Sequence, residues 1–439
     1  MYLKGSKWSY THKRSRPANP FRLFVLVALV GSALYVNQVV VPTIPPPFVP
    51  TATPNRPPES FVTEAENFVS DGKISKAIQA YESAIQADPK NPSNYITLAR
   101  LQIYAGNYTA AITNTENAML LSQNNSMAYA LRGWAQTFLG NYLDAESSLN
   151  TAVELDANNA IAYAYQAEVY ALEYNNGISQ IGTIDKAIEL SKKAQQMGPD
   201  LMETHRARGV VLEITGNYEE AAAEYEAAIA INKNVGELHL SLGRIYRLLT
   251  FYDKAIEEFN RANTLNPTDP LPLTYISRTY ALVGDYAKAI QIGEQAIQIN
   301  PDDAYLYGNL GTWLYSNFDF EGSLANLRLA INGGETNDGV VVTGLPIDNT
   351  NTRVVEYYYY YALALARQGE CKDAVEVADL ILKTSADNEY AVANAEAAID
   401  ICRESNGLPP ATSTVEGEDD GEIDAEATEE PSMEETPEP

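Results

Sequence analysis

The stretch Gly216-Asn217-Tyr218-Glu219-Glu220-Ala221 decides the fold, because related stretches return along the chain in the same register. Tyr225 and Ala228 follow it at fixed spacing, and further copies begin at Gly140 and Gly284. Where copies are consecutive, as from Gly106 to Gly140, the repeat is 34 residues long. A repeat of this length predicts an array of similar structural units and not a globular domain with one central core.

The residues of the repeat indicate a pair of helices. Small and aromatic residues at these spacings fall on one stripe of a helix, where they let a second helix approach closely. The glycine ends the first helix, and a proline such as Pro89 or Pro301 begins the next unit. One helix–turn–helix cannot bury its apolar stripe alone, so we expect neighbouring units to stack and bury it together.

These features resemble the tetratricopeptide repeat family over roughly residues 58–403. The family's small residue of the first helix recurs as Ala65, Ala99, Gly133, Ala167, Gly209, Gly243, Ser277, Gly311 and Ala362, and its central alanine as Ala77, Ala111, Ala145, Ala187, Ala221, Ala255, Ala289 and Ala374. The nine units start near Pro58, Pro92, Ser126, Ala160, Met202, Gly236, Pro270, Ala304 and Val355. The resemblance implies an all-α fold: a right-handed α-solenoid of about nine helix-turn-helix repeats over residues 59–403, closed by a capping helix at 389–403.

Two units depart from the pattern. The fourth has extra residues at 173–183, which predict a longer helix or loop. The eighth has Ser323 at the central alanine position and is followed by an insert at 333–352, whose valine run at 340–342 favours a small hairpin. In the ninth unit, five tyrosines occupy 357–361; helical spacing places Tyr358 and Tyr361 inward and Tyr357 on another face.

The N-terminal part of the chain predicts a membrane anchor. Residues 1–22 contain six Lys/Arg and no acidic residue, and residues 23–41 are mostly apolar. Nineteen helical residues span about 28 Å, close to the thickness of the hydrocarbon core. The basic flank places residues 1–22 in the cytoplasm and the repeats outside it. Cleavage of a signal peptide near Ala33 is the alternative, although the apolar run continues past that residue.

Two further segments differ from the repeats in composition. Residues 42–58 contain eight prolines, which favour an extended stalk between membrane and repeats. Residues 404–439 carry thirteen Asp/Glu and no Lys/Arg, which is typical of a disordered tail. The whole chain has a formal charge of −28. Because such an acidic protein repels phosphate backbones, we expect no nucleic-acid partner.

The two cysteines, Cys371 and Cys402, fall at the start of the ninth unit's second helix and near the end of the capping helix. Antiparallel packing of these helices brings the two residues close together. Outside the cytoplasm they are expected to form a structural disulfide, the alternative being two buried thiols.

The sequence lacks the motifs of the common enzyme classes. It has no phosphate-binding loop, dinucleotide fingerprint, zinc-protease helix, nucleophile elbow or C-x-x-C. His205 and His239 are one repeat apart, and nothing beside them supplies a ligand set, so we expect them to pack between helices and hold no metal. The sequence therefore predicts a protein without catalysis, cofactor or metal.

In the family that the chain resembles, the first helix of each unit lines a concave groove. Its register places the following residues there as candidate partner contacts: Arg206, Arg244, Arg247, Arg278, Tyr305 and Tyr315. It also places Glu168, Glu203, Glu213 and Glu237 there. Two interpretations stay open, because an arginine fork suits an acidic peptide but pairs equally with a neighbouring glutamate.

These observations predict a membrane-anchored scaffold that binds proteins or peptides at the cell envelope, attached through residues 23–41. The alternative is a secreted binding protein released by cleavage near Ala33. The sequence does not identify the partner.

Overall fold

The computed structural model describes residues 19–40, 56–178 and 180–408. The chain divides into two compact units, Met1–Arg56 and Pro57–Pro439. Most of the expected basic segment (1–18), most of the expected stalk (42–55) and most of the expected acidic tail (409–439) lie outside the described residues.

The first unit contains one apolar helix. Helix α1, Pro20–Tyr35, continues into a short π-helical segment, η1, Val36–Val40. It begins three residues before the expected Leu23, because Pro20 fits the first turn and the side chain of Asn19 accepts a hydrogen bond from the Phe21 N–H at 3.1 Å. Residues Pro20–Val39 have a mean hydropathy of 1.6, and none of them is buried within the structure. By length and composition this helix is able to cross a membrane, although signal sequences share these properties.

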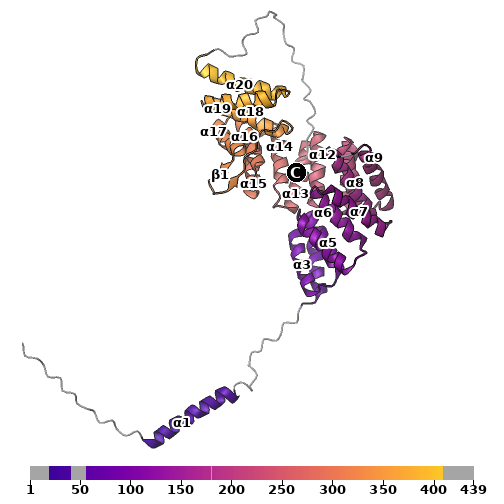
Figure 1. The fold of residues 1–439 in the computed structure, drawn as a ribbon, viewed down its shortest axis with the longest axis vertical. Helices are drawn as coiled ribbons and strands as arrows, with labels where there is room; N and C mark the ends of the chain where they lie inside the picture. The colour runs from indigo at the N-terminus through magenta and orange to yellow at the C-terminus, as the bar shows by residue number, and fades with distance from the viewer. Residues whose placement is uncertain (1–18, 41–55, 179, 409–439) are drawn as a thin grey trace, which may run out of the picture. The chain divides into compact units, whose positions relative to one another are not determined.

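The second unit is an α-solenoid of helical hairpins, confirming the expected fold (Figure 1). The first helices of its nine repeats are α2 (Pro58–Ser70), α4 (Pro92–Tyr104), α6 (Ser126–Phe138), α8 (Ala160–Asn175), α10 (Met202–Ile214), α12 (Gly236–Leu248), α14 (Leu271–Leu282), α16 (Ala304–Ser316) and α18 (Thr352–Arg367). The second helices are α3 (Ile74–Ala87), α5 (Tyr108–Leu121), α7 (Tyr142–Leu155), α9 (Thr183–Met197), α11 (Tyr218–Ile231), α13 (Tyr252–Leu265), α15 (Tyr286–Ile299), α17 (Phe320–Asn332) and α19 (Cys371–Thr384). Helix α20, Glu389–Ser405, follows as the capping helix.

A residue with left-handed backbone turns the chain between the two helices of each repeat. Gly216, for example, has a φ of 75°, and the next amide, that of Asn217, donates back to the Leu212 carbonyl at 2.9 Å. This bond satisfies one of the carbonyls that the end of α10 leaves free. Thr250 and Phe318 adopt the same conformation at the equivalent positions of the sixth and eighth repeats, with φ of 61° and 65°.

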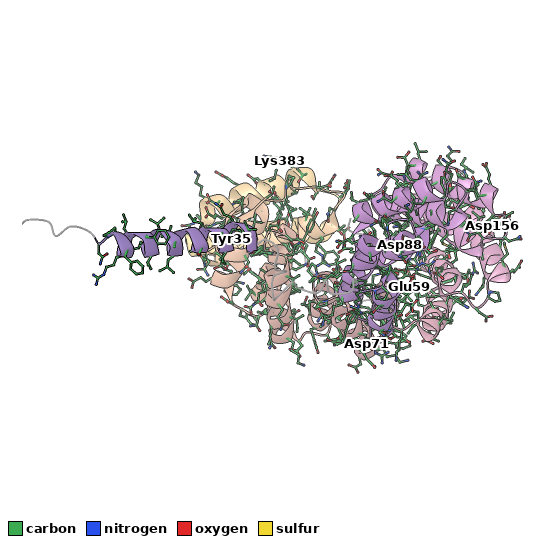
Figure 2. All side chains as sticks on the ribbon, turned by 90° about the horizontal axis from the view of Figure 1, so that it is seen from below. Tyr35, Glu59, Asp71, Asp88, Asp156 and Lys383 are labelled. Atoms are coloured by element: carbon green, nitrogen blue, oxygen red, sulfur yellow. A yellow bond between two sulfur atoms is a disulfide. The ribbon has the colours of Figure 1, made fainter. Side chains whose placement is uncertain are left out.

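Small residues allow close contact between the two helices of a repeat. A Cβ on Gly243 would lie 2.5 Å from the ring of Phe259, and a Cβ on Gly133 would lie 2.6 Å from Leu149. The central alanines, such as Ala145, are fully buried, and Ser323 takes their place in the eighth repeat with no exposure. Glu59, Asp71 and Asp156 are among the exposed charged residues of the array (Figure 2).

The two irregular repeats have the features that the sequence indicated. Helix α8 is lengthened to 16 residues, and a loop leads from it to α9. The insert after α17 contains strands β1 (Gly334–Glu335) and β2 (Val341–Val342), which pair antiparallel. The insert packs on the array, because Val342 is buried and the Tyr358 hydroxyl donates to the Leu345 carbonyl at 2.9 Å.

The array curves enough for distant repeats to touch. The side-chain amide of Asn234, just before α12, donates to the carbonyls of Val69 and Ser70 at 3.1 and 2.9 Å. At the same place, a Cβ on Gly72 would lie 2.9 Å from Leu265. The turn of the first repeat therefore packs against the sixth, and the repeats between them enclose their own inner face.

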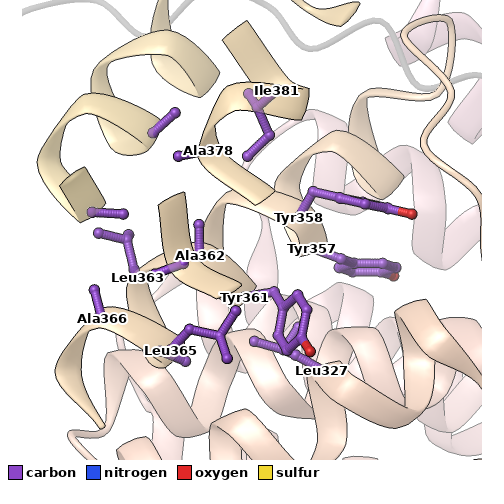
Figure 3. Close-up of a cluster of buried hydrophobic side chains, with 14 of the residues drawn as sticks. Leu327, Tyr357, Tyr358, Tyr361, Ala362, Leu363, Leu365, Ala366, Ala378 and Ile381 are labelled. Carbon is purple, nitrogen blue, oxygen red and sulfur yellow. The ribbon is translucent and has the colours of Figure 1, made fainter. Parts of the chain in front are cut away.

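The last repeat and the capping helix share a buried cluster (Figure 3). Tyr358 and Tyr361 are buried as expected, and Tyr357, on another face of α18, is buried as well, with no exposed side-chain surface. Gly308 on α16 provides the space for the Tyr357 ring, because a Cβ on Gly308 would lie 2.4 Å from that ring. Cys371 and Cys402 form a disulfide, with their Cα atoms 5.4 Å apart, which links α19 to α20.

We predict that Gly243→Ala destabilises the array by about 1–3 kcal/mol, because the added methyl overlaps Phe259. Gly236→Ala is the matched control, since its Cβ would make only ordinary contacts, 3.5 Å or more away. Thermal unfolding followed by circular dichroism measures the difference. An equal midpoint for both variants would contradict close packing at this crossing.

We predict that reducing the disulfide loosens the C-terminal end of the array. The bond joins residues 31 apart in sequence, which corresponds to about 3.5 kcal/mol of chain entropy. Hydrogen exchange with and without reductant should show faster exchange in α18, α19 and α20. The variant Cys371→Ser/Cys402→Ser should exchange fast in both conditions, and unchanged exchange on reduction would refute the prediction.

Candidate functional site

The inner face of the early repeats is closed by its own side chains. Trp134 on α6, Tyr165 and Glu168 on α8, and Arg206 on α10 all lie on this face, and each is at most 2% exposed. Arg206 was a candidate partner contact. The structure buries it, so it cannot contact a partner unless the early repeats open.

Arg206 is held by an aromatic ring and two carboxylates. Its guanidinium lies 4.3 Å from the ring centre of Trp134, which stacks on Tyr165 at 4.5 Å with the planes nearly parallel. The indole N–H of Trp134 donates to Glu168 Oε2 at 3.0 Å, and Arg206 pairs with the same oxygen. A second pair joins Arg206 to Glu237 at 3.3 Å.

Burial sets the electrostatics of this cluster. It raises the pKa of Glu168 to about 7, against the opposing effect of the Arg206 guanidinium. Arg206 itself is also desolvated by burial, but the charges of Glu168 and Glu237 outweigh this and raise its pKa. Perturbed groups of this kind are common at functional sites, but here each charge is met by a neighbour in the same chain.

The second repeat completes the closure. Tyr104 places its ring edge against Trp134 at 5.8 Å, and its burial raises its pKa. Arg100 lies 4.0 Å from Glu203 on α10. Side chains from the second to the fifth repeat thus meet across the inner face.

Arg244, a further candidate, is also paired within the chain. Its guanidinium contacts Glu213 at 3.0 Å, and the Tyr225 hydroxyl donates to the other oxygen of this carboxylate at 2.7 Å. The interpretation that groove arginines pair with groove glutamates therefore holds for Arg206 and Arg244. Arg244 differs in that 30% of its side-chain surface remains exposed.

Arg247 and Arg278 lie around one tyrosine. Their guanidinium groups are 5.5 and 5.8 Å from the ring centre of Tyr275, which stacks on Phe259 at 5.2 Å. Arg247 is buried, whereas Arg278 is half-buried. Arg244 and Arg247 lie on α12, and Arg278 lies on the next first helix, α14.

Tyr305 and Tyr315 lie at opposite ends of α16. Tyr305 packs its ring edge against Tyr357 at 6.3 Å and accepts a hydrogen bond from Asn351 at 3.2 Å. Tyr315 contacts the rings of Phe320 and Tyr360 at 5.1 and 5.2 Å. Both tyrosines are half-buried, so each keeps part of its ring accessible.

Sequence reasoning missed the aromatic residues beside Tyr315, namely Phe318 and Phe320. Phe318 is 82% exposed. The available signal was its position, since a phenylalanine stands where most repeats have the turn glycine.

The described residues contain few groups that could support a metal site. Across 19–40, 56–178 and 180–408, no group of three or more His, Cys, Asp or Glu could hold a metal ion. His239 has both ring nitrogens engaged, Nδ1 with Glu258 at 2.6 Å and Nε2 with the Lys233 carbonyl at 2.9 Å. His205 repeats this arrangement with Glu224 and Pro199. Both histidines therefore tie the helices of their own repeats together.

We predict that Arg206→Met destabilises the array by about 3–5 kcal/mol, because it leaves Glu168 buried without its partner. The pKa of the Glu168 carboxyl in the folded protein is above its unfolded value of 4.5. The destabilisation caused by burying the charged carboxylate therefore appears as pH rises through the unfolded pKa and is complete above the folded pKa. Adding Glu168→Gln to Arg206→Met should therefore recover more stability at pH 8 than at pH 5.5. Thermal midpoints of the two variants at both pH values measure this, and a recovery independent of pH would count against a buried, ionisable Glu168.

Comparison with protein families agrees with this architecture. Three tetratricopeptide repeat models match the chain: one over residues 68–135, a second over 202–235, and a third over 128–159, 236–269 and 276–303. No curated protein sequence matches significantly.

Solved structures that match part of this chain come from several bacteria. A tetratricopeptide repeat protein from Parabacteroides merdae is 15% identical, with 58% of this chain and 98% of that one covered and a TM-score of 0.37. A thermophilic repeat protein from Thermus thermophilus is 23% identical, with 43% and 98% covered and a TM-score of 0.37. PilF from Pseudomonas aeruginosa is 20% identical, with 47% and 91% covered and a TM-score of 0.40. The repeat motif, the stacked helical hairpins and the family matches together show that this chain belongs to the tetratricopeptide repeat family.

Proposed function

We propose that this protein is a membrane-anchored scaffold that binds a protein partner through the inner face of its later repeats. One observation carries the proposal: the centre of the early inner face, at Trp134, Glu168 and Arg206, is at most 2% exposed, whereas Arg244, Arg278, Tyr305 and Tyr315 of the later repeats are half-exposed. Trp134 and Arg206 are at most 2% exposed, but Arg244 retains 30% of its side-chain surface. The binding surface consists of Arg244, Arg278, Tyr305 and Tyr315, and Arg247 is buried beside it.

The chemistry of this surface favours a peptide segment with acidic groups. Arginine forks bind carboxylates through paired hydrogen bonds, and tyrosine rings contribute contact area at low entropic cost. Binding has to displace or share Glu213, which holds Arg244 in the free protein. The partner therefore supplies its own carboxylates or engages the exposed edge of the guanidinium.

The N-terminal helix supplies the anchor in this proposal. Residues Pro20–Val39 are apolar and long enough to span a bilayer, and six Lys/Arg lie within residues 1–22. This charge distribution favours a cytoplasmic N-terminus with the solenoid outside, a compartment in which the Cys371–Cys402 disulfide is stable. Release by cleavage near Ala33 remains the alternative, and the mass of the mature N-terminus distinguishes the two.

The proposed role is assembly without catalysis. It draws on the family, whose repeats serve as interaction surfaces, and on the internal pairing of the buried charges described above. A partner is expected among proteins of the same envelope compartment.

We predict that Arg244→Gln/Arg278→Gln weakens partner capture at least about tenfold, since central arginines often dominate binding energy. The full-length protein, purified in detergent, is mixed with solubilised envelope extract, and retained proteins are identified by mass spectrometry. Arg261→Gln/Arg328→Gln is the matched control, because these arginines are exposed on the second helices α13 and α17 and carry the same charge. Equal capture by both variants would move the binding surface away from the later inner face.

A further inference from the structure

Both ring nitrogens of His239 face hydrogen-bond acceptors. Nδ1 lies 2.6 Å from Glu258 Oε2, and Nε2 lies 2.9 Å from the Lys233 carbonyl oxygen. A carbonyl oxygen and an ionised carboxylate can only accept hydrogen bonds, whereas a neutral imidazole has a single N–H to donate. The two bonds therefore form together only when the His239–Glu258 pair holds one more proton than a neutral imidazole and a carboxylate.

The bond to the Lys233 carbonyl is the one that depends on this proton. A neutral His239 can donate to Glu258 or to the carbonyl, and the carboxylate is the stronger acceptor. The position of Glu258 is fixed independently, because Arg261 contacts its other oxygen at 3.0 Å. Loss of the proton therefore releases the Lys233 carbonyl, which lies in the loop between α11 and α12.

This loop carries the contact that joins the sixth repeat to the first. The side-chain amide of Asn234 donates to the carbonyls of Val69 and Ser70 at 3.1 and 2.9 Å. We name this contact the latch. The fit is close, because a Cβ on Gly72 would lie 3.3 Å from Asn234 Oδ1. A loop movement of about 1 Å is enough to open the latch, since such hydrogen bonds are roughly 2.7–3.2 Å long.

His205 in the fifth repeat provides an internal comparison. It makes the same pair of bonds, with Glu224 and with a carbonyl of the loop between α9 and α10. That loop is also held by Thr204, whose hydroxyl donates to the Gly198 carbonyl at 2.6 Å. The equivalent residue of the sixth repeat is Leu238, which has no side-chain donor. The loop before α12 therefore depends on its histidine more than the loop before α10 does.

The other charged groups on the elements around His239 are paired or exposed. On α11, Glu226 accepts a hydrogen bond from a tyrosine hydroxyl at 2.5 Å. On α13, Glu257 pairs with Arg261 at 2.5 Å, and the Lys233 side chain in the loop is exposed. The proton on the His239–Glu258 pair is therefore the charge whose loss acts on the loop.

Two carboxyls elsewhere in the array also titrate near neutral pH. Burial raises the pKa of Glu168 and that of Glu173 to about 7. Both lie on α8, and neither belongs to the latch. A variant of His239 separates its effect from theirs, because it leaves both carboxyls in place.

We propose that His239 is a proton-dependent lock, which keeps the latch closed at acidic to neutral pH and lets it open at alkaline pH. The lock acts while the imidazole is doubly protonated and is lost as pH rises. Without it the loop before α12 moves, and the first repeat separates from the sixth. The enclosed inner face around Trp134 and Arg206 then becomes accessible. This role is separate from partner binding at the later repeats.

Two spin labels measure the state of the latch. They are attached after Glu82→Cys on α3 and Asp253→Cys on α13, two exposed positions of the first and sixth repeats. The native cysteines are bonded to each other and do not take up the label. In the full-length protein in detergent, the distance distribution is expected to be narrow at pH 6 and to extend to longer distances at pH 9. A distribution independent of pH would overturn the proposal.

His239→Gln is the decisive variant, because glutamine is uncharged and has its donors on one nitrogen. It should give the broad distribution at both pH values, and His205→Gln, the matched control, should keep the native pH response. Circular dichroism confirms that both variants are folded. A pH response that survives in His239→Gln would assign it to other carboxyls and contradict the proposal.

Asn234→Ala tests the latch with His239 left in place. It should give the broad distribution at pH 6 as well as at pH 9. A narrow distribution at pH 6 in this variant would show that the contact of Asn234 with the first repeat does not hold the two repeats together, which would also overturn the proposal.

Access to the inner face has its own readout. With Trp8→Phe/Trp313→Phe, Trp134 is the only tryptophan, and acrylamide should quench it about twofold more strongly at pH 9 than at pH 6. Adding Asn234→Ala should give the stronger quenching at both pH values. Equal quenching of Trp134 at the two pH values would refute the inferred access to the inner face.

Discussion

Close approach of the two helices within each repeat is the constraint on which the rest of the structure depends. Glycine, alanine or serine faces the partner helix at each crossing, and at Gly133 or Gly243 even one methyl group would overlap the neighbouring side chain. Helix pairs this close stack on each other with a small rotation, and the rotations accumulate along the array. The contact of Asn234 with Val69 and Ser70 is the result, since it joins residues about 165 positions apart in sequence.

This curvature divides the inner face into two parts with different properties. In the early repeats the face is enclosed, and Arg206, Glu168 and Trp134 form a polar core that resembles a protein interior more than a binding groove. Removing one member of such a core is costly, so it favours a fixed shape over exchange of ligands. In the later repeats, Arg244, Arg278, Tyr305 and Tyr315 remain half-exposed. Recognition is therefore expected at the C-terminal part of the array.

The repeats could be predicted from the sequence because their signals are local. The turn glycine, the central alanine and the helix-starting residues recur at fixed spacing, and α10 and α12 begin at Met202 and Gly236 as expected. The burial of Arg206 could not be predicted in this way, because it depends on rotations summed over several repeats that bring Glu168 and Glu237 around it. The burial of Tyr357 could not be predicted either, because it depends on the space beside Gly308 in another helix. The unusual position of Phe318 could have been recognised from the sequence, because a phenylalanine stands where most repeats have the turn glycine.

The most direct test of this account measures whether the inner face of the early repeats is closed in solution. The chain has three tryptophans, and Trp8→Phe/Trp313→Phe leaves Trp134 as the only one. Trp134 is 2% exposed and lies between Tyr165 and Arg206. The account predicts that acrylamide quenches its fluorescence only weakly in the folded protein and strongly after denaturation. Strong quenching in the folded protein would show an open groove around Arg206 and would contradict the account.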